Sequence, residues 1–252
     1  MIFEVSSIFL AVAVTSALSG VLGMGGGIIL MGVLTSLLPS SAAMILHGIS
    51  QVTANGSRAI LHYKYIKWKI IPYYIIGAAI SVAFLSAFSF IPSKWVIFLL
   101  MGLMPFGALL LKGKLSLNIE SPIQAVICAI LVNLMQLSCG VSGPVLDIFF
   151  VRTKLSRHEV VSTKAITQTF GHALKLVYYG GIVNSTNDVS LPFYVPFVVC
   201  AIAIVGTWMG GKWLNRASNE WFQTWSQRII QVIGVVYLFK GAMEFYKVFV
   251  AA

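Results

Sequence analysis

The sequence predicts an all-α membrane protein with two inverted repeats, each built of a re-entrant broken-helix hairpin followed by three transmembrane helices. Composition is the first observation, because 58% of the 252 residues are hydrophobic and only 10% are charged, whereas soluble domains carry about 25% charged residues. The second is a series of eight long apolar segments. The third is a pair of glycine-rich breaks, which begin at Gly23 and Gly140 and therefore lie 117 residues apart.

Each apolar segment is a candidate helix because its length suits a membrane. A hydrocarbon core of about 30 Å takes about 20 apolar residues in helical conformation, and the runs at 70–90 and 191–211 meet this requirement. Short polar connections such as 62–69 and 152–157 separate the segments. In chain order, the segments are 5–38 (interrupted), 42–61, 70–90, 95–111, 121–152 (interrupted), 158–182, 191–213 and 220–246.

The first and fifth segments are interrupted at Gly23-Met-Gly-Gly-Gly27 and Gly140-Val-Ser-Gly-Pro144. Glycine permits a sharp reversal and proline ends a helix, so each interrupted segment is expected to enter and leave the membrane on one face. Close helix packing through small residues is the alternative explanation for the glycines. Three consecutive glycines and a proline exceed what such packing needs.

Two otherwise apolar helices, 42–61 and 158–182, each carry one stripe of polar side chains. The spacing i, i+4, i+8 and i+11 confines a stripe to an arc of about 80° on a helix with about 100° per residue. Ionisable residues inside a membrane helix are costly and usually functional. The stripes consist of His47, Gln51, Asn55 and Arg58 in one helix and of Lys164, Gln168, His172 and Lys175 in the other.

The breaks and stripes are part of a series of similar residues that occur in the same order in residues 1–114 and in residues 115–252. Weak internal similarity of this kind is typical of transporter repeats. We therefore predict two transmembrane repeats within one membrane domain. The matched pairs are Gly23 with Gly140, Gly26 with Gly143, Ser50-Gln51 with Thr167-Gln168, Arg58 with Lys175 and, after a loop insertion, Ser93-Lys-Trp95 with Asn219-Glu-Trp221.

The distribution of Lys and Arg favours hairpins over full crossings of the two interrupted segments. With full crossings, the connections and ends carry seven basic residues on one side and six on the other, whereas with hairpins they carry ten against three. The second distribution obeys the positive-inside rule and places both termini outside the cytoplasm. Full crossing stays the alternative, since a leg of about 18 residues can span a membrane by itself.

Together, the breaks and stripes indicate a binding site for a small anion. The second part of an interrupted helix begins with free N–H groups and a partial positive charge, and two such ends near the membrane midplane form an anion site. The stripes add basic and amide donors that suit a compact oxyanion. The residues expected to bind the anion are Gly25, Gly26, Gly27, Gln51, Asn55, Arg58, Ser142, Gly143, Gln168, His172 and Lys175.

Some stripe residues have simpler explanations. Arg58 and Lys175 lie toward the ends of their helices and could extend to the membrane interface. Gln51 and Gln168 could join helices by hydrogen bonds. The two members nearest the starts of their helices are expected to contribute least to the site, and these are His47 and Lys164.

Asp147 is the only acidic residue in a break region, and Leu30 takes its place in the first half. A carboxylate that breaks the symmetry could couple transport to protons. It could equally form a structural ion pair with Lys164 or Arg152.

The net charge of +10 would suggest nucleic acid in a soluble protein, but most basic residues lie in connections between apolar segments. We expect no nucleic-acid partner; the expected partners are a small anion and membrane lipid, and a homo-oligomer is an open alternative. The three cysteines lack metal-ligand or disulfide spacing. No cofactor and no metal are expected.

We do not expect an enzyme, because metalloprotease and nucleotide-binding motifs are absent from the sequence. One enzymatic alternative is an intramembrane hydrolase of the rhomboid type. In that case Ser142, within Gly140-Val-Ser-Gly143, would be the nucleophile and His172 its base.

The first break, Ser-Gly-Val-Leu-Gly-Met-Gly-Gly-Gly-Ile-Ile, followed by a helix with Gln51 and Asn55, resembles the TauE/SafE family, also called toluene sulfonate uptake permeases. Gly140-Val-Ser-Gly-Pro144 with Thr167-Gln168 is similar to the second copy in that family, although it lacks a run of glycines. The resemblance covers the whole chain. It implies a multi-pass secondary transporter of the cytoplasmic membrane that moves sulfite, sulfonates or related anions by alternating access. An anion channel is the alternative.

Overall fold

In the computed structural model, the described parts of the chain are residues 2–22, 25–112, 114–183, 191–214 and 219–250. They form α-helices with one 3-10 turn, one π-helical turn and no strand. The all-α prediction is therefore confirmed. The elements are α1 (Ile2–Leu22), α2 (Gly25–Leu37), α3 (Ser40–Leu61), η1 (Tyr63–Tyr65), α4 (Ile71–Ser86), α5 (Lys94–Leu111), α6 (Pro122–Cys139), α7 (Gly143–Phe150), α8 (Arg157–Val177), η2 (Tyr178–Ile182), α9 (Val195–Leu214) and α10 (Asn219–Phe249).

Several helices suit a membrane by length and composition. Among the described residues, Lys94–Leu111, Pro122–Cys139 and Gln227–Phe249 are long and apolar enough to cross one, and shorter apolar stretches lie in α1, α2, α4 and α9. The striped helices α3 and α8 have 22 and 21 residues, so at 1.5 Å per residue each is about 30 Å long. The arrangement of eight segments as inverted repeats stays a prediction.

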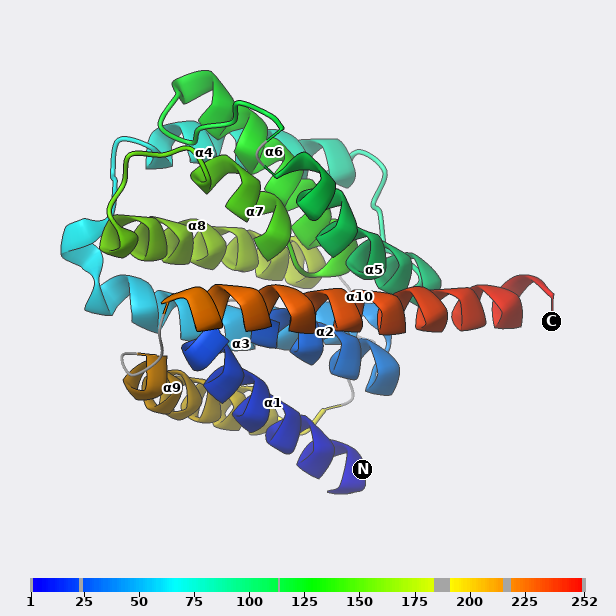
Figure 1. The fold of residues 1–252 in the computed structure, drawn as a ribbon. Helices are drawn as coiled ribbons and strands as arrows, with labels where there is room; N and C mark the ends of the chain where they lie inside the picture. The colour runs from blue at the N-terminus through cyan, green and yellow to red at the C-terminus, as the bar shows by residue number, and fades with distance from the viewer. Residues whose placement is uncertain (1, 23–24, 113, 184–190, 215–218, 251–252) are drawn as a thin grey trace.

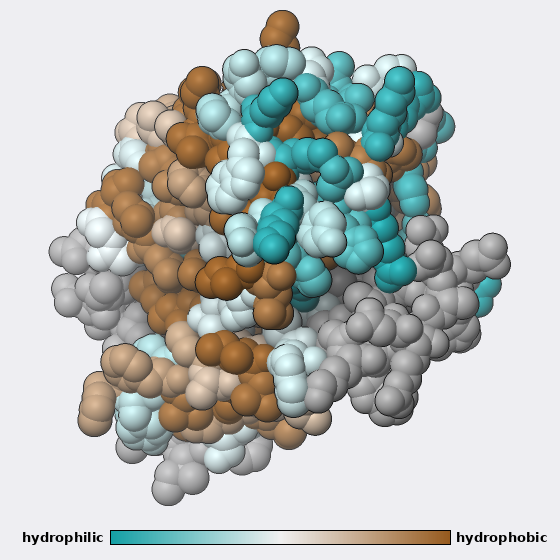
Figure 2. Space-filling view, turned by 90° about the vertical axis from the view of Figure 1, so that its left-hand side faces the viewer, coloured by the Kyte–Doolittle hydropathy of each residue, from teal (hydrophilic) through white to brown (hydrophobic). Residues whose placement is uncertain are grey.

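Large apolar side chains cover much of the outside of the bundle, as expected for a surface in contact with lipid. Phe193, Phe197 and Phe239 have exposed fractions of 85%, 73% and 68%. Figure 2 faces the end of the molecule that carries the connection between α3 and α4. Hydrophilic residues gather in one region of this face and apolar surface borders them.

In the second half, the break ends one helix and begins another. α6 ends at Cys139, and Gly140 follows with a φ of +82°, a left-handed conformation that favours glycine. α7 begins at Gly143 with Pro144 in its first turn, where the N–H that proline lacks would have no helical partner. In the first half, α2 begins at Gly25, directly after residues 23–24, which lie outside the described part.

The helices on either side of each break pack against each other. α2 lies against α1, and α7 lies against α6 (Figure 1). Gly26 is required for the first of these contacts, because a Cβ atom there would lie 2.0 Å from Thr15 O and 2.2 Å from Ser19 Oγ. The glycines of the first break therefore permit close packing of α1 on α2 as well as the reversal itself.

Helices of the two halves pack against one another in a reciprocal way. α1 packs against α9, α6 packs against α4, and α5 packs against α10. The striped helices α3 and α8 lie side by side within the bundle. In Figure 1 both chain ends lie toward the right, and the connection from α3 to α4 and the start of α8 lie at the opposite end.

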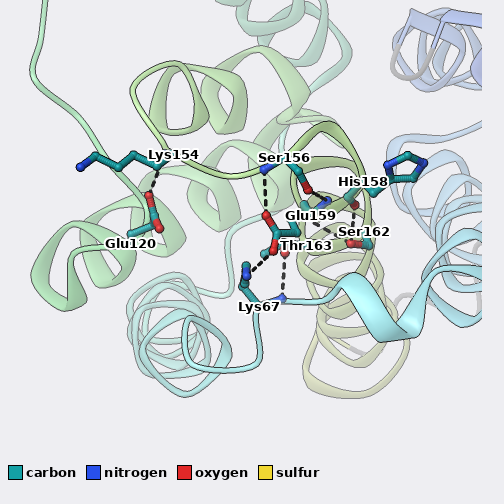
Figure 3. Close-up of polar contacts among 8 residues, drawn as sticks. All are labelled: Lys67, Glu120, Lys154, Ser156, His158, Glu159, Ser162 and Thr163. Atoms are coloured by element: carbon teal, nitrogen blue, oxygen red, sulfur yellow. Dashed lines mark hydrogen bonds and ion pairs between the residues drawn. The ribbon is translucent and has the colours of Figure 1, made fainter.

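A polar cluster at that end fastens the connection from α3 to α4 onto the first turns of α8 (Figure 3). Lys67 forms an ion pair with Glu159, and its backbone N–H donates to Thr163 Oγ1 at 3.0 Å. Ser156 and Glu159 form a reciprocal capping box, in which Glu159 accepts from the Ser156 N–H at 2.8 Å. The cluster therefore fixes where α8 starts and where the chain leaves α3.

The capping box makes a first prediction. Ser156→Ala should lower the free energy of unfolding by about 1 kcal/mol, because an exposed N-cap that loses its side-chain hydrogen bond costs about 0.5–2 kcal/mol. Ser93→Ala is the matched control, since Ser93 is an exposed N-cap serine of α5 without a side-chain cap hydrogen bond. Thermal unfolding of the detergent-purified variants measures both. Equal midpoints for the two variants would contradict the assigned cap.

Candidate functional site

The polar stripes of α3 and α8 face each other where the two helices come closest. Gly48 permits this approach, because a Cβ atom there would lie 2.6 Å from Leu176 Cδ2 and 3.4 Å from Lys175 Cε. On α3, His47, Gln51 and Asn55 are buried. Most of the first stripe therefore lies inside the protein.

One chain of hydrogen bonds connects the two breaks through these helices. Lys175 Nζ lies 3.1 Å from the carbonyl oxygen of Gly140 and 2.8 Å from His47 Nδ1. His47 Nε2 lies 2.9 Å from the carbonyl oxygen of Gly27. A residue of α8 and a residue of α3 thus join the end of α6 to the start of α2. We call Lys175 and His47 the bridging pair.

The geometry limits where the bridging pair can carry protons. A carbonyl oxygen only accepts, so the contact with Gly27 requires a proton on His47 Nε2. A single further proton fits between His47 Nδ1 and Lys175 Nζ, since two N–H groups pointing at each other would repel. That proton is present whether Lys175 is a neutral amine or an ammonium, and the pair carries one positive charge when Lys175 is an ammonium.

In the protonated pair this positive charge is buried without an acidic partner. Lys175 and His47 both have exposed fractions of 0%. Among the described residues, the ion pairs are Lys67–Glu159, Lys164–Asp147 and Lys247–Glu244, and none includes Lys175. A buried charge is strongly destabilising unless an opposite charge compensates it. The site therefore favours an anion.

Buried polar groups without partners line the second break. Ser142 Oγ donates to Gln136 Oε1 at 2.6 Å. Gln136 Nε2, Asn133 Oδ1 and His172 Nδ1 are buried and have no hydrogen-bond partner. Gly171 brings α8 close to these amides, because a Cβ atom there would lie 2.7 Å from Gln136 Nε2 and 2.9 Å from Asn133 Oδ1. Of these atoms, Gln136 Nε2 is a donor and Asn133 Oδ1 an acceptor. Unpaired buried polar groups of either kind are costly, which makes this region suited to a polar ligand.

At the first break, glycine backbone meets the amides of α3. A Cβ atom on Gly27 would lie 3.2 Å from Gln51 Oε1. Asn55 Nδ2 donates to the backbone oxygen of Gln51 at 3.0 Å and to its Oε1 at 3.3 Å, so the amide of Gln51 is held in position. Arg58 Nη2 donates to Ser19 O at 3.3 Å. Arg58 thus contacts a carbonyl near the end of α1, as Lys175 does at the end of α6.

The structure brings together only some of the residues that sequence analysis selected. Gly27, Gln51, Asn55, His172 and Lys175 are buried around the facing stripes, and the break residues Gly25, Gly26 and Ser142 are buried as well. Gly143, Arg58 and Gln168 are half-buried. Arg58 lies near the end of α1, through its contact with Ser19.

The structure places two stripe residues differently from what their positions in the sequence suggested. Lys175 does not extend to the interface, because its ammonium is buried between α3, α6 and α8. His47 lies in the centre of the hydrogen-bond chain, although its place near the start of α3 suggested a minor role. The positions of both side chains depend on the backbone carbonyls at the breaks. No pattern of side chains in the sequence shows where those carbonyls lie.

Of the two interpretations of Asp147, the structure shows the ion pair with Lys164. Sequence analysis missed Asn133 and Gln136. The sequence does contain a signal for these two amides, because they stand three residues apart on an apolar helix. They also lie 117 residues after Ser16 and Ser19, which are buried as well.

The serine–histidine alternative finds no support in the geometry. Ser142 donates its hydroxyl to Gln136, and His172 Nδ1 has no partner. A catalytic dyad requires the two side chains to share a hydrogen bond. Among the described residues, no group of three or more His, Cys, Asp or Glu could hold a metal ion.

Apolar helices around a buried lysine–histidine pair between two helix breaks define a helical membrane protein. The chain belongs to the sulfite exporter TauE/SafE family, whose model matches residues 8–237. The family resemblance is thereby confirmed, and it makes the chain a membrane transport protein. Nothing among curated proteins and nothing among solved structures matches the chain significantly.

The left-handed glycine that ends α6 makes a second prediction. Gly140→Ala should destabilise the protein by about 2 kcal/mol or more, because the left-handed conformation costs a non-glycine residue about 1–2 kcal/mol and the new Cβ would lie 2.4 Å from Met31 Sδ. Gly107→Ala in α5 is the control, since no atom lies within 4 Å of its Cβ position and alanine stabilises a helix interior by about 0.5–1 kcal/mol. The two unfolding midpoints should shift in opposite directions; a neutral Gly140→Ala would refute the assignment.

Proposed function

We propose that this protein is a secondary transporter that carries small sulfur oxyanions, namely sulfite and small sulfonates, across the cytoplasmic membrane by alternating access. The observation that carries the proposal is the burial of the bridging pair, whose positive charge, when Lys175 is protonated, no carboxylate of the described residues compensates. Membership of the TauE/SafE family supports the class of cargo. A carrier needs such a site to be vacated and refilled, which a permanent internal ion pair would prevent.

In this proposal the anion lies between the two breaks. Lys175 supplies the charge, and the first turns of α2 and α7 supply backbone N–H groups at the positive ends of helix dipoles. The amides of Gln51, Asn55 and Gln168 and the imidazole of His172 orient the oxygens, and Arg58 attracts the anion from the end of α1. A sulfonate group has three oxygens around one sulfur, so several donors from different helices can bind it at once.

Reciprocal packing of the halves supports inverted repeats. An offset of 117 residues relates α1 to α6, and after the loop insertion α4 corresponds in chain order to α9. The pairs that pack together are α1 with α9 and α4 with α6. The contacts of Arg58 and Lys175 with carbonyls near the ends of α1 and α6 follow the same relation. We propose that the two repeats rock against each other around the site, and that the cluster around Lys67 and Glu159 closes one end.

The hairpin topology makes a third prediction. If segments 5–38 and 121–152 are re-entrant, both chain ends and the connection at 38–40 lie outside the cytoplasm. In a variant without Cys128, Cys139 and Cys200, cysteines at Glu4 and Ser40 should then react with an impermeant reagent from the same face. A cysteine at Lys64 should react from the other face. Reaction of Glu4→Cys and Ser40→Cys from opposite faces would support full crossings.

Binding by Lys175 makes a fourth prediction. The purified protein should gain thermal stability with sulfite or a small sulfonate, because a ligand that binds only the folded state stabilises it by mass action, by about 2.7 kcal/mol at a hundredfold excess over Kd. Lys175→Met should abolish this gain. Lys240→Met is the control, since Lys240 contacts only Ser36 and Phe98 at the edge of the bundle and its gain should be retained. An equal gain in both variants would place the anion elsewhere.

Flux measurements separate the carrier from its alternatives. In proteoliposomes, a carrier shows saturable sulfonate flux with counterflow, and a channel shows unsaturated flux that follows the membrane potential. An intramembrane hydrolase would instead cleave membrane peptides and lose that activity in Ser142→Ala.

A further inference from the structure

We infer that each anion is carried together with a proton, and that the bridging pair Lys175–His47, rather than Asp147, binds and releases this proton. The inference rests on the proposed function and adds the coupling ion to it. Its starting point is the number of hydrogen bonds that the ammonium of Lys175 makes.

Lys175 can lose a proton without losing its contacts. Its nitrogen makes two hydrogen bonds to the protein, at 2.8 Å to His47 Nδ1 and at 3.1 Å to Gly140 O. An ammonium group has three N–H donors, so one donor remains for a bound anion. A neutral amine has two N–H groups, which suffice for both protein contacts. The charged and neutral forms therefore fit the same geometry.

The surroundings of Lys175 contain no negative charge that would keep it protonated. No ion pair of the described residues includes it, and the thiol of Cys139 donates to a backbone carbonyl and is therefore protonated. Among the described residues, the third donor therefore has no counter-ion. The titratable groups around Lys175 are His47 of α3, His172 of α8, Cys139 of α6 and, beyond Cys139, Tyr179 of η2.

Charge balance then links the proton to the cargo. With a monoanion bound, the protonated pair makes the site neutral. After the anion leaves, the same pair would hold an uncompensated positive charge inside the protein, which is strongly unfavourable. Release of one proton from nitrogen restores neutrality. One N–H bond forms when the anion binds and one breaks when it leaves, so a proton crosses the membrane with each monoanion.

Asp147 is poorly placed for this role. Its carboxylate is paired with Lys164, and the two side chains have exposed fractions of 34% and 17%. The ion pair is neutral whether or not an anion occupies the site, so binding creates no reason for Asp147 to gain a proton. The pocket beside α7 that Asp147 lines also contains Lys112, from the end of α5.

His172 extends the inference to dianions. Its ring centroid lies 5.3 Å from that of His47, and its buried Nδ1 has no partner. A second proton can bind there when the cargo carries two negative charges. The expected ratio is therefore one proton for each negative charge carried.

The test uses methanesulfonate, which does not itself take up protons near neutral pH, in proteoliposomes with a pH indicator inside. Wild-type protein should move about one proton per methanesulfonate, because one charge must be balanced for each anion, and the membrane potential should not drive the flux. Methanesulfonate flux without proton movement would overturn the inference and leave the proposed function standing. Absence of any sulfur oxyanion flux would overturn both.

Two variants assign the proton to a residue. In Lys175→Arg the charge stays but cannot be lost, because a guanidinium is always protonated, so the proton-to-anion ratio should fall from about one to about zero and the remaining flux should follow the membrane potential. In Asp147→Asn the ratio should stay near one, whatever the rate. The opposite result in the two variants would assign coupling to Asp147.

A binding measurement keeps the assignment testable if Lys175→Arg carries nothing. Calorimetric titration of wild-type protein with methanesulfonate, in two buffers that differ in ionisation enthalpy, counts the protons taken up on binding. We expect about one proton for wild-type and for Asp147→Asn, from the same charge balance. A count of zero in wild-type would overturn the inference.

Discussion

The hydrogen-bond chain from Gly140 O through Lys175 and His47 to Gly27 O is the interaction on which the rest of the site depends. Two broken helices inside a membrane leave backbone groups that lipid cannot satisfy. Here a lysine from α8 donates to the carbonyl oxygen of Gly140 at the second break, and a histidine from α3 contacts the carbonyl oxygen of Gly27 in the first turn of α2. These two contacts fix the distance between the breaks. They also bury a pair of side chains that can carry a positive charge.

The bridging pair thus joins the two breaks and, in the proposed function, also binds the cargo. When Lys175 is protonated, the charge of the bridging pair is unfavourable in an empty site and favourable beside an anion. The close approaches at Gly26 and Gly48 serve the same arrangement, because a side chain at either position would separate the helices that carry the contacts. A transporter that moves one repeat against the other has to keep these contacts or exchange them, and the lysine has the flexible side chain to do so.

The sequence allowed the helical class, the family and the breaks to be predicted because these depend on local chemistry. Glycine and proline mark where a helix stops, and long apolar runs mark where helices lie in a membrane. The depth of Lys175 and the central place of His47 were not predictable, since both depend on where backbone carbonyls of other helices lie. Asn133 and Gln136 were missed because neither carries a charge, although burial makes their unpaired atoms part of the site.

The central claim is that an anion binds beside the bridging pair. Its most direct test is a structure determined with bromomethanesulfonate, in which the anomalous signal of bromine locates the ligand. The account predicts a peak between the starts of α2 and α7, with a sulfonate oxygen about 2.7–2.9 Å from Lys175 Nζ, the usual length of a charge-assisted hydrogen bond. A single peak beside Asp147 in the pocket between α5, α7 and α10, with none at Lys175, would contradict it.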